Sequence, residues 1–226
     1  MRRMTLGNPE TITKFAYNAT NNGDDEVSGE LDFSTLTALT ECEMSASKLS
    51  SLSFLSTFPN TIIKIKCARN DFYNMSLPSS FVSYTNLRNL NLSNSGIKGT
   101  IPNLSNLTSL KAVQFEGNTT NAHVTGWRAH LKGRHSITTS YEGITAVASD
   151  FALPATITTI DLRYNGLSAA EVTKVLEACV AQSSFTTGTV DVRFQKNGGD
   201  TLNSAGTTAK DTLVARGITV EFGGVQ

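Results

Sequence analysis

The chain has 226 residues and carries 19 basic and 19 acidic side chains, so it lacks the basic excess that drives binding to nucleic acid. Its length is enough for one substantial core or one continuous stack of repeats, whereas two independent domains would be a tight fit. No apolar run approaches membrane-spanning length, and the basic N-terminus lacks the apolar stretch of a signal peptide. We therefore expect neither membrane insertion nor export by a signal peptide.

The first segment, residues 1–30, is predicted to form an N-terminal arm and cap. Ile12, Phe15 and Tyr17 are spaced as on a strand, and the sequence Asn-Asn-Gly-Asp at 21–24 is typical of a turn. The pattern predicts a strand that covers the first layer of whatever follows.

The second segment, residues 31–200, repeats one template with apolar residues at positions 1, 4, 6 and 11 and an Asn or small polar residue at position 9. The clearest copies begin at Leu87 and Ile157, and a degenerate copy runs from Ile137 to Ile144. The polar anchors fall at 47, 70, 95, 118, 142, 165 and 197, at intervals of 23, 25, 23, 24, 23 and 32. Recurrence near one value predicts a stack of similar units.

The template has a simple structural interpretation. Apolar residues two apart lie on the same side of a short strand, and the polar residue follows where the chain must turn. A buried Asn at that turn can donate and accept hydrogen bonds, so stacked Asn side chains can satisfy backbone groups that the bend leaves unpaired. The residues expected to form this structural ladder are Asn70, Asn118, Asn165 and Asn197.

The stretch 87–102, Leu-Arg-Asn-Leu-Asn-Leu-Ser-Asn-Ser-Gly-Ile-Lys-Gly-Thr-Ile-Pro, resembles the leucine-rich-repeat consensus, including the Gly-x-Ile-Pro continuation of the plant-like subclass. The resemblance covers residues 36 to 197. It implies an α/β solenoid, a leucine-rich-repeat stack of short parallel strands with turns, with short helices in the C-terminal repeats. The sequence departs from the consensus at Glu142, where a charge replaces the anchor Asn.

Two segments near the C-terminus are predicted to be helical. Ser168 with Glu171 three residues later forms a capping-box pattern ahead of a helix that lengthens its repeat. A second helix is expected from Ser204 to Gly217, followed by a strand over 218–222. Together they predict a C-terminal helix-strand cap over residues 201–226.

The residues between the apolar positions point to the exposed face of the predicted sheet, which is the usual binding surface of a solenoid. The repeat alignment places Glu41 beside Lys64, Glu43 beside Lys66 and Asp161 beside Arg193, so their charges should neutralise one another. No aromatic residue falls in these rows, which favours a plain solvated sheet over a groove for a glycan or a protein loop. The candidates for interaction on this concave face are Glu43, Lys66, Asn89, Asn91, Gln114, Glu116, Thr138, Asp161, Arg163 and Arg193.

Catalytic or metal chemistry finds little support in the sequence. His123, His130 and His135 lie close together, but their spacings of 7 and 5 match no ligand motif, and a surface loop explains them. The acidic run 24–26 lacks the alternating oxygen ligands of a calcium loop. We expect no catalytic residues, no metal and no cofactor, and hence no enzyme.

The three cysteines also fit a structural role. Cys42, Cys67 and Cys179 have no metal-ligand spacing, and Cys42 and Cys67 occupy different template positions in adjacent repeats. Reduced, buried thiols that act as small core residues are therefore expected, without a bridge.

The segment 200–220 resembles the terminal segment of repeat proteins encoded by bacteriophages and some surface-displaying bacteria. The resemblance implies a non-enzymatic structural protein of the virion, either a capsid decoration or a tail or fibre protein, which makes protein–protein contacts with other virion proteins. Residues 1–11 would dock on such a partner, with Arg2 and Arg3 as candidate ion-pair donors. The alternative is an adhesion or ligand-recognition module at the bacterial cell surface, which binds a cell-surface protein or glycan.

Overall fold

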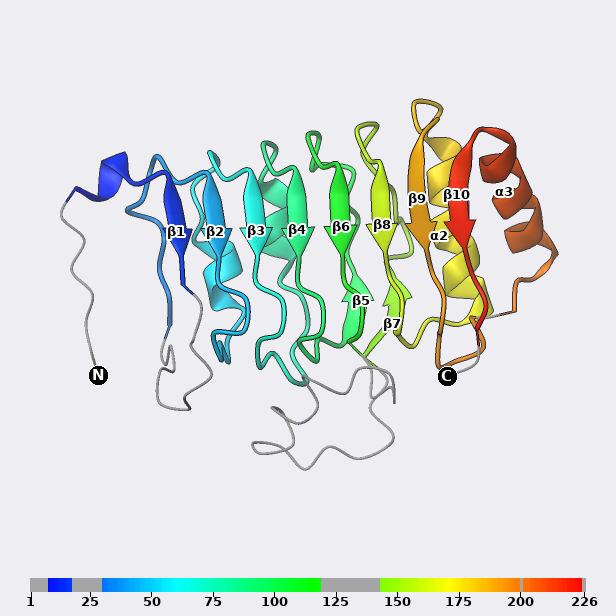
Figure 1. The fold of residues 1–226 in the computed structure, drawn as a ribbon, viewed down its shortest axis with the longest axis horizontal. Helices are drawn as coiled ribbons and strands as arrows, with labels where there is room; N and C mark the ends of the chain where they lie inside the picture. Colours follow the sequence, from blue (N-terminus) through cyan, green and yellow to red (C-terminus); the bar gives the residue numbers. More distant parts are fainter. Residues whose placement is uncertain (1–7, 18–29, 119–142, 200, 225–226) are drawn as a thin grey trace.

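A computed structural model describes residues 8–17, 30–118, 143–199 and 201–224. Eight strands form one open sheet, in which each strand lies parallel to its neighbours and the strands follow one another in chain order (Figure 1). They are β1 (Lys14–Ala16), β2 (Glu41–Glu43), β3 (Lys64–Lys66), β4 (Asn89–Asn91), β6 (Ala112–Gln114), β8 (Thr159–Asp161), β9 (Gly188–Asp191) and β10 (Ile218–Glu221). Because the sheet does not close, β1 and β10 are its two edges.

Helices and a small second sheet complete the fold. Figure 1 shows α2 and the helical turns behind β2 and β4 on one side of the eight-stranded sheet, and no described helix covers its other side. The helices are η1 (Pro9–Thr11), η2 (Ser53–Ser56), η3 (Ser79–Ser83), α2 (Ala169–Ala181) and α3 (Ser204–Ala215), and the second sheet pairs β5 (Gly99–Ile101) with β7 (Ile144–Val147). In these described ranges, no helix is both long and apolar enough to cross a membrane.

The core confirms the apolar positions of the template. The central residue of each internal strand points away from the exposed face, and it is at most 2% exposed to solvent. These residues lie in one register across the sheet: Cys42, Ile65, Leu90, Val113, Ile160 and Val190. Burial of this row and of the apolar residues behind it stabilises the sheet, at roughly 25 cal/mol for each Å² removed from water.

A turn of constant geometry follows the strands. At its first position the backbone adopts a left-handed conformation, with φ between 54° and 71°. The residues that occupy this position are Ala46, Arg69, Asn94, Gly117, Tyr164 and Phe194. The next residue along the chain carries a buried polar side chain: Ser47, Asn70, Ser95, Asn118, Asn165 and Gln195. The two rows together fix which residue is the anchor of each unit.

Asn70 shows how an anchor stabilises the turns. Its Oδ1 accepts hydrogen bonds from the backbone N–H groups of Ser47 (3.0 Å) and Leu49 (3.1 Å) in the preceding unit. Its Nδ2 donates to the carbonyl oxygens of Met44 and Cys67, both at 2.8 Å. One side chain therefore satisfies four backbone groups that would otherwise be buried without a partner.

The same pattern recurs at Asn118 and weakens at Asn165. Asn118 accepts from the N–H groups of Ser95 (3.0 Å) and Ile97 (3.2 Å) and donates to the Phe115 carbonyl (2.8 Å). Asn165 also donates to Phe115 (2.9 Å), but its buried Oδ1 has no hydrogen-bond partner. The ladder predicted for Asn70, Asn118 and Asn165 is thus confirmed, with one incomplete position.

The fourth predicted member of the ladder, Asn197, is wrong. Val190 of β9 pairs with Ile160 of β8, so the last unit is shifted by two residues from the sequence alignment. The anchor is Gln195, which is buried and accepts from the N–H of Leu167 (3.1 Å), whereas Asn197 is exposed and bonds the preceding unit by donating to the Gly166 carbonyl (2.7 Å). Gln195 can replace Asn because its amide offers the same donor and acceptor on a side chain one carbon longer.

The degenerate copy at 137–144 does not add a strand to the eight-stranded sheet. β6 pairs directly with β8, through Val113 and Ile160, so no strand lies between them. Ile144 instead begins β7 of the second sheet. Glu142, the predicted anchor, falls outside the described residues. The chain between the end of β6 and the start of β8, residues 115–158, is therefore one long connection between neighbouring strands.

The C-terminal helices lie where they were predicted. Ser168 caps α2, because its hydroxyl accepts a hydrogen bond from the Glu171 N–H at 3.3 Å. The reciprocal half of the capping box is wrong: the Glu171 carboxylate accepts from the Val147 N–H (2.8 Å) and pairs with Lys174 (2.6 Å). It thereby ties α2 to β7. Gly217, with φ of 89°, follows α3 and leads into β10.

The cysteines are buried, free thiols, as predicted. A hydrogen bond with Cys67, together with burial, raises the pKa of Cys42, and burial raises that of Cys179. Cys42 lies opposite Ile65 of β3, and Cys67 follows two residues after Ile65, just beyond the end of that strand. Two thiols at that offset contact each other as neighbours in the core.

Candidate interaction surface on the exposed face of the sheet

The uncovered side of the sheet carries rows of side chains in strict register. The first row is Lys14, Glu41, Lys64, Asn89, Ala112, Thr159, Thr189 and Thr219. The second row is Ala16, Glu43, Lys66, Asn91, Gln114, Asp161, Asp191 and Glu221. Asp161 therefore lies beside Asp191, and its predicted place beside Arg193 is wrong for the same two-residue shift.

Charges of opposite sign alternate across β1, β2 and β3. Lys14 contacts Glu41 at 3.1 Å and Glu43 at 3.5 Å, and Lys64 contacts Glu43 at 2.5 Å. The predicted neighbours Glu41 and Lys64, and Glu43 and Lys66, are register partners, but the ion pair forms diagonally between Lys64 and Glu43. The hydrogen bond from Lys64 lowers the pKa of Glu43. Such exposed pairs stabilise little individually.

The middle of the face is neutral and amide-rich. The Asn91 Nδ2 donates to the Gln114 Oε1 at 2.9 Å, across β4 and β6, and its Oδ1 accepts from the Ser93 N–H at 3.0 Å. Asn89 lies two residues before Asn91 and is exposed. These side chains offer hydrogen bonds without charge.

The C-terminal part of the face contains what we call the arginine–carboxylate network: Glu116, Asp161, Arg163, Asp191, Arg193 and Glu221. Arg163 binds Asp161 through two hydrogen bonds, from Nε (2.9 Å) and Nη2 (2.7 Å). Arg193 binds Asp191 in the same way, at 3.0 and 2.7 Å. Each guanidinium is held by the carboxylate two residues before it, in the bidentate geometry that gives charge-assisted pairs their strength.

Further ion pairs join these units across the strands. The Arg163 Nη2 lies 3.1 Å from a Glu116 oxygen, and its Nε lies 3.2 Å from an Asp191 oxygen. The Arg193 Nη1 lies 3.9 Å from Glu221. The four carboxylates and two guanidinium groups of the network carry a formal charge of −2, which nearby Arg69 offsets in part, so this part of the face favours a partner that brings positive charge.

Glu116 is a member of the network whose pKa is raised. Burial is the main cause of the raised pKa, and repulsion from Asp161 adds to it, while Arg163 acts in the opposite direction. The hydrogen bond with Asp161 in turn raises the pKa of Arg163, so this guanidinium stays charged. The folded state therefore favours the protonated form of Glu116 relative to the unfolded chain.

Replacing Glu116 by Gln is expected to stabilise the protein at neutral pH, by about 0.5 kcal/mol. A raised pKa means that ionisation of this group costs stability as the pH rises through it, and Gln removes that cost. The gain should vanish below about pH 4.3, the ordinary glutamate pKa. Urea unfolding at neutral pH and below about pH 4.3 measures the gain in stability. Glu177→Gln, on the exposed surface of α2, is the control. A gain that persists unchanged in acid would contradict this account.

An aromatic pair borders the network. Tyr164 and Phe194 stack with ring centroids 4.6 Å apart and planes inclined by 4°, and the guanidinium of Arg193 lies 5.6 Å from the Phe194 centroid. Both rings occupy the left-handed turn position directly after an arginine. Sequence reasoning missed the pair, although the repeated Asp-x-Arg-aromatic motif at 161–164 and 191–194 signals it.

Several predicted candidates cannot be placed. Thr138, the histidines at 123, 130 and 135, and the acidic run 24–26 lie outside the described residues, as do Arg2 and Arg3. Among the side chains that are described, no group of three or more His, Cys, Asp and Glu residues could hold a metal ion. The other candidates lie together on the exposed face: Glu43, Lys66, Asn89, Asn91, Gln114, Glu116, Asp161, Arg163 and Arg193.

No protein-family model, no curated protein and no solved structure matches the chain.

Proposed function

We propose that the chain is a leucine-rich-repeat solenoid with a non-enzymatic, structural role, and that it binds other proteins through the exposed face of its sheet. The sequential order of the parallel strands supports the solenoid, as does the anchor ladder at Asn70, Asn118 and Asn165. Stacked units of this kind bury a continuous core and present an extended surface, which is how repeat proteins bind partners.

The observation that carries the proposal is the arginine–carboxylate network beside the stacked pair of Tyr164 and Phe194. Arginine and aromatic side chains contribute most of the binding energy at protein interfaces. Here ion pairs hold both guanidinium groups in place before a partner arrives, so that little side-chain entropy is lost on binding. The expected partner is a protein surface with basic side chains, in keeping with the formal charge of −2.

The same geometry favours binding over catalysis. The cysteines, which are the strongest nucleophiles among the described residues, are buried, and Cys42 and Cys179 have raised pKa values that disfavour the reactive thiolate. The carboxylates Asp161 and Asp191 are engaged by Arg163 and Arg193. Groups committed in this way serve to order a surface.

We further propose that the protein is a bacteriophage virion component, as a head decoration or a tail or fibre protein. The resemblance of the α3–β10 segment to the ends of phage repeat proteins supports this location. Residues 1–11, with Arg2 and Arg3, would add a second contact to the particle. The alternative, a bacterial surface adhesion or ligand-recognition module, would use the same face on a cell-surface protein or glycan.

Combined replacement of Arg193 and Phe194 by Ala is expected to lower incorporation of the protein into virus particles about tenfold, which corresponds to about 1.4 kcal/mol of binding energy. Particles purified from cells that express each variant would be assayed by quantitative immunoblotting. Glu177→Ala, on the opposite side of the molecule, is the matched control, and thermal unfolding verifies that both variants fold.

Two other outcomes would count against the proposal. Equal incorporation of the face variant and the control would reject the exposed face as the binding surface. Absence of the protein from particles, combined with saturable binding to bacterial cells that the face variant loses, would favour the adhesion alternative.

A further inference from the structure

We propose that copies of this chain associate end to end, with the free edge of β10 in one copy pairing in parallel with the free edge of β1 in the next. The contact would continue the eight-stranded sheet from one molecule into another. It involves the two ends of the sheet and does not depend on what binds to its exposed face.

The backbone of β10 leaves an unpaired edge. The carbonyl oxygens of Glu221 and Gly223 accept hydrogen bonds from the N–H groups of Val192 (2.9 Å) and Phe194 (3.0 Å), so these residues face β9. Backbone groups of successive residues in a strand point to opposite sides. The N–H and C=O of Val220 therefore point out of the sheet, to a side on which none of the described strands neighbours β10.

The edge of β1 is complementary. The Thr13 carbonyl accepts from the Thr40 N–H (2.8 Å), and the Tyr17 N–H donates to the Glu43 carbonyl (2.8 Å). By the same alternation, the N–H and C=O groups of Ala16 point away from β2. Within the sheet, the backbone N–H and C=O of a residue on the exposed face bond to the preceding strand. Ala16 lies on the exposed face of β1, so its N–H and C=O point to where a preceding strand would lie.

The charges at the two ends also match. In a continued register, Glu221 of one copy lies beside Ala16 of the next, as Glu43 lies beside Ala16 within the chain. Lys64, which lies in the same row as Lys14, forms an ion pair with Glu43 of the preceding strand, so Lys14 of the next copy can reach Glu221 in the same way. Both side chains are accessible, at 50% for Lys14 and 46% for Glu221, and the only ion pair of Glu221 within the described residues is the long contact to Arg193.

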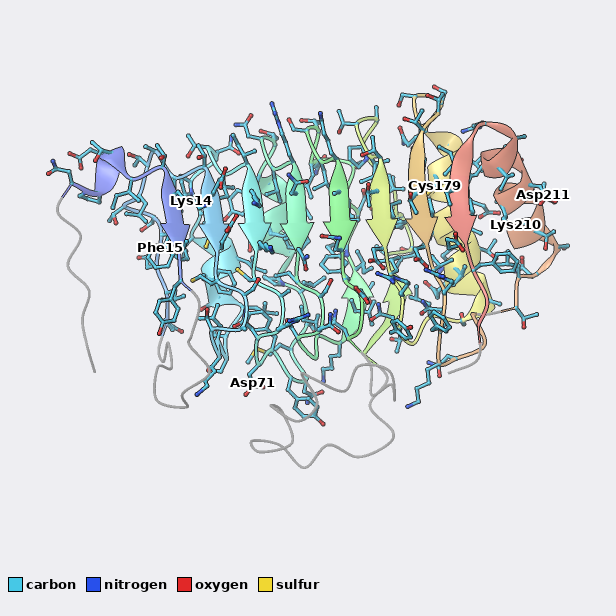
Figure 2. The ribbon with its side chains drawn as sticks, in the orientation of Figure 1. Lys14, Phe15, Asp71, Cys179, Lys210 and Asp211 are labelled. Atoms are coloured by element: carbon cyan, nitrogen blue, oxygen red, sulfur yellow. The ribbon has the colours of Figure 1, made fainter. Side chains whose placement is uncertain are left out.

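Apolar surface gathers at the same ends. Val214 (53% exposed) and Phe222 (38%) are the two exposed large hydrophobic side chains of the described residues, and they flank β10. Ile12, Phe15 and Tyr17 at the β1 end are only partly buried. Figure 2 shows Phe15 at one end of the molecule and α3, which carries Val214, at the other. Joining the ends would cover both sets.

Complementary but different ends define a head-to-tail contact, which produces rings or open filaments. The strands are short, with three residues in β1 and four in β10, so the buried area is small. Interfaces at the small end of the range bind weakly. The association should therefore depend on protein concentration.

Two proline variants of the full chain test the proposal. Val220→Pro removes the outward N–H of β10, and Ala16→Pro removes that of β1, and neither N–H bonds within the sheet. Multi-angle light scattering should show the mass of the wild-type protein rising with concentration, while each variant alone stays monomeric. An equimolar mixture should form a 1:1 complex, because Ala16→Pro retains an intact β10 edge and Val220→Pro retains an intact β1 edge.

A charge variant provides an independent arm in case a proline perturbs folding. Glu221→Lys places like charges together at the junction and should weaken association at least tenfold at low salt, whereas Thr219→Ser, also on β10, should not. A wild-type protein that stays monomeric at all concentrations would overturn the proposal. So would assembly by Ala16→Pro alone, which would indicate a symmetric β10–β10 contact instead.

Discussion

Replacing Asn118 by Ala is expected to lower the free energy of unfolding by about 3 kcal/mol. The substitution removes the acceptor of the Ser95 and Ile97 N–H groups in the buried turn, whereas the Phe115 carbonyl keeps the hydrogen bond from Asn165. Both N–H groups are buried in the turn, and a buried donor that loses its hydrogen bond destabilises the folded state. Urea unfolding followed by circular dichroism measures the loss.

Two matched variants separate this effect from the general loss of an amide. Asn165→Ala should cost less than Asn118→Ala, because the Oδ1 of Asn165 has no partner to lose. Asn89→Ala, on the exposed face, should change stability by less than about 0.5 kcal/mol. Equal losses for all three substitutions would show that the anchors are not what stabilises the turns.

Replacing Gly188 by Ala should destabilise the protein by about 3 kcal/mol or more. Gly188 begins β9 with φ of 132°, and a Cβ built on it would lie 2.0 Å from the Thr158 carbonyl oxygen. That oxygen accepts the hydrogen bond of the Thr189 N–H, at 3.0 Å, so a shift of either strand disrupts the β8–β9 pairing. The melting temperature and the urea midpoint should both fall.

Gly198 provides the control for this glycine. It also has a positive φ, of 80°, but a Cβ there meets no atom within 4 Å. Gly198→Ala should therefore cost only the conformational penalty, about 1 kcal/mol. If the two variants lost the same stability, the close approach of Gly188 to β8 would not be the cause.

The parts of the fold that were predictable are those where residue type and period agree. The template located the buried residues of β2, β3, β4, β6 and β8, because side chains of a strand alternate and an Asn can satisfy a buried turn. Ser168 and Gly217 similarly marked the start of α2 and the end of α3, since both act through local backbone geometry.

The register of the last unit is not predictable from the sequence, because two registers fit the template. In the register predicted from the sequence, the apolar positions are Val192 and Phe194 and the polar position is Asn197. In the observed register, Val190 takes an apolar position and Gln195 takes the polar one, which requires Gln to replace Asn. Pairing with β8, which places Val190 beside Ile160, decides between them. Such pairing is a long-range property that local spacing cannot reveal.

The same ambiguity of register is the reason why the contacts of Arg193 and Phe194 are not predictable from the sequence. The shifted register places Arg193 beside Asp161 and Phe194 at an apolar core position, so it predicts neither the pairing of Arg193 with Asp191 nor the stacking of Phe194 on Tyr164. Likewise, the weak match at 137–144 could not be distinguished from an insertion, because a long connection can carry apolar residues at similar spacing by chance. The register of the last unit and the absence of a strand between β6 and β8 are both determined by strand pairing.

Cysteine accessibility in the assembled particle tests most directly whether the exposed face is the binding surface. Thr159→Cys places a thiol on that face and Glu177→Cys places one on α2, while the three native thiols are buried and give little background. Both variants would be treated with a maleimide, free and incorporated into particles. We predict that the thiol at 159 is protected in particles and that the thiol at 177 stays reactive. Equal labelling at 159 in the free and the assembled protein would contradict the account.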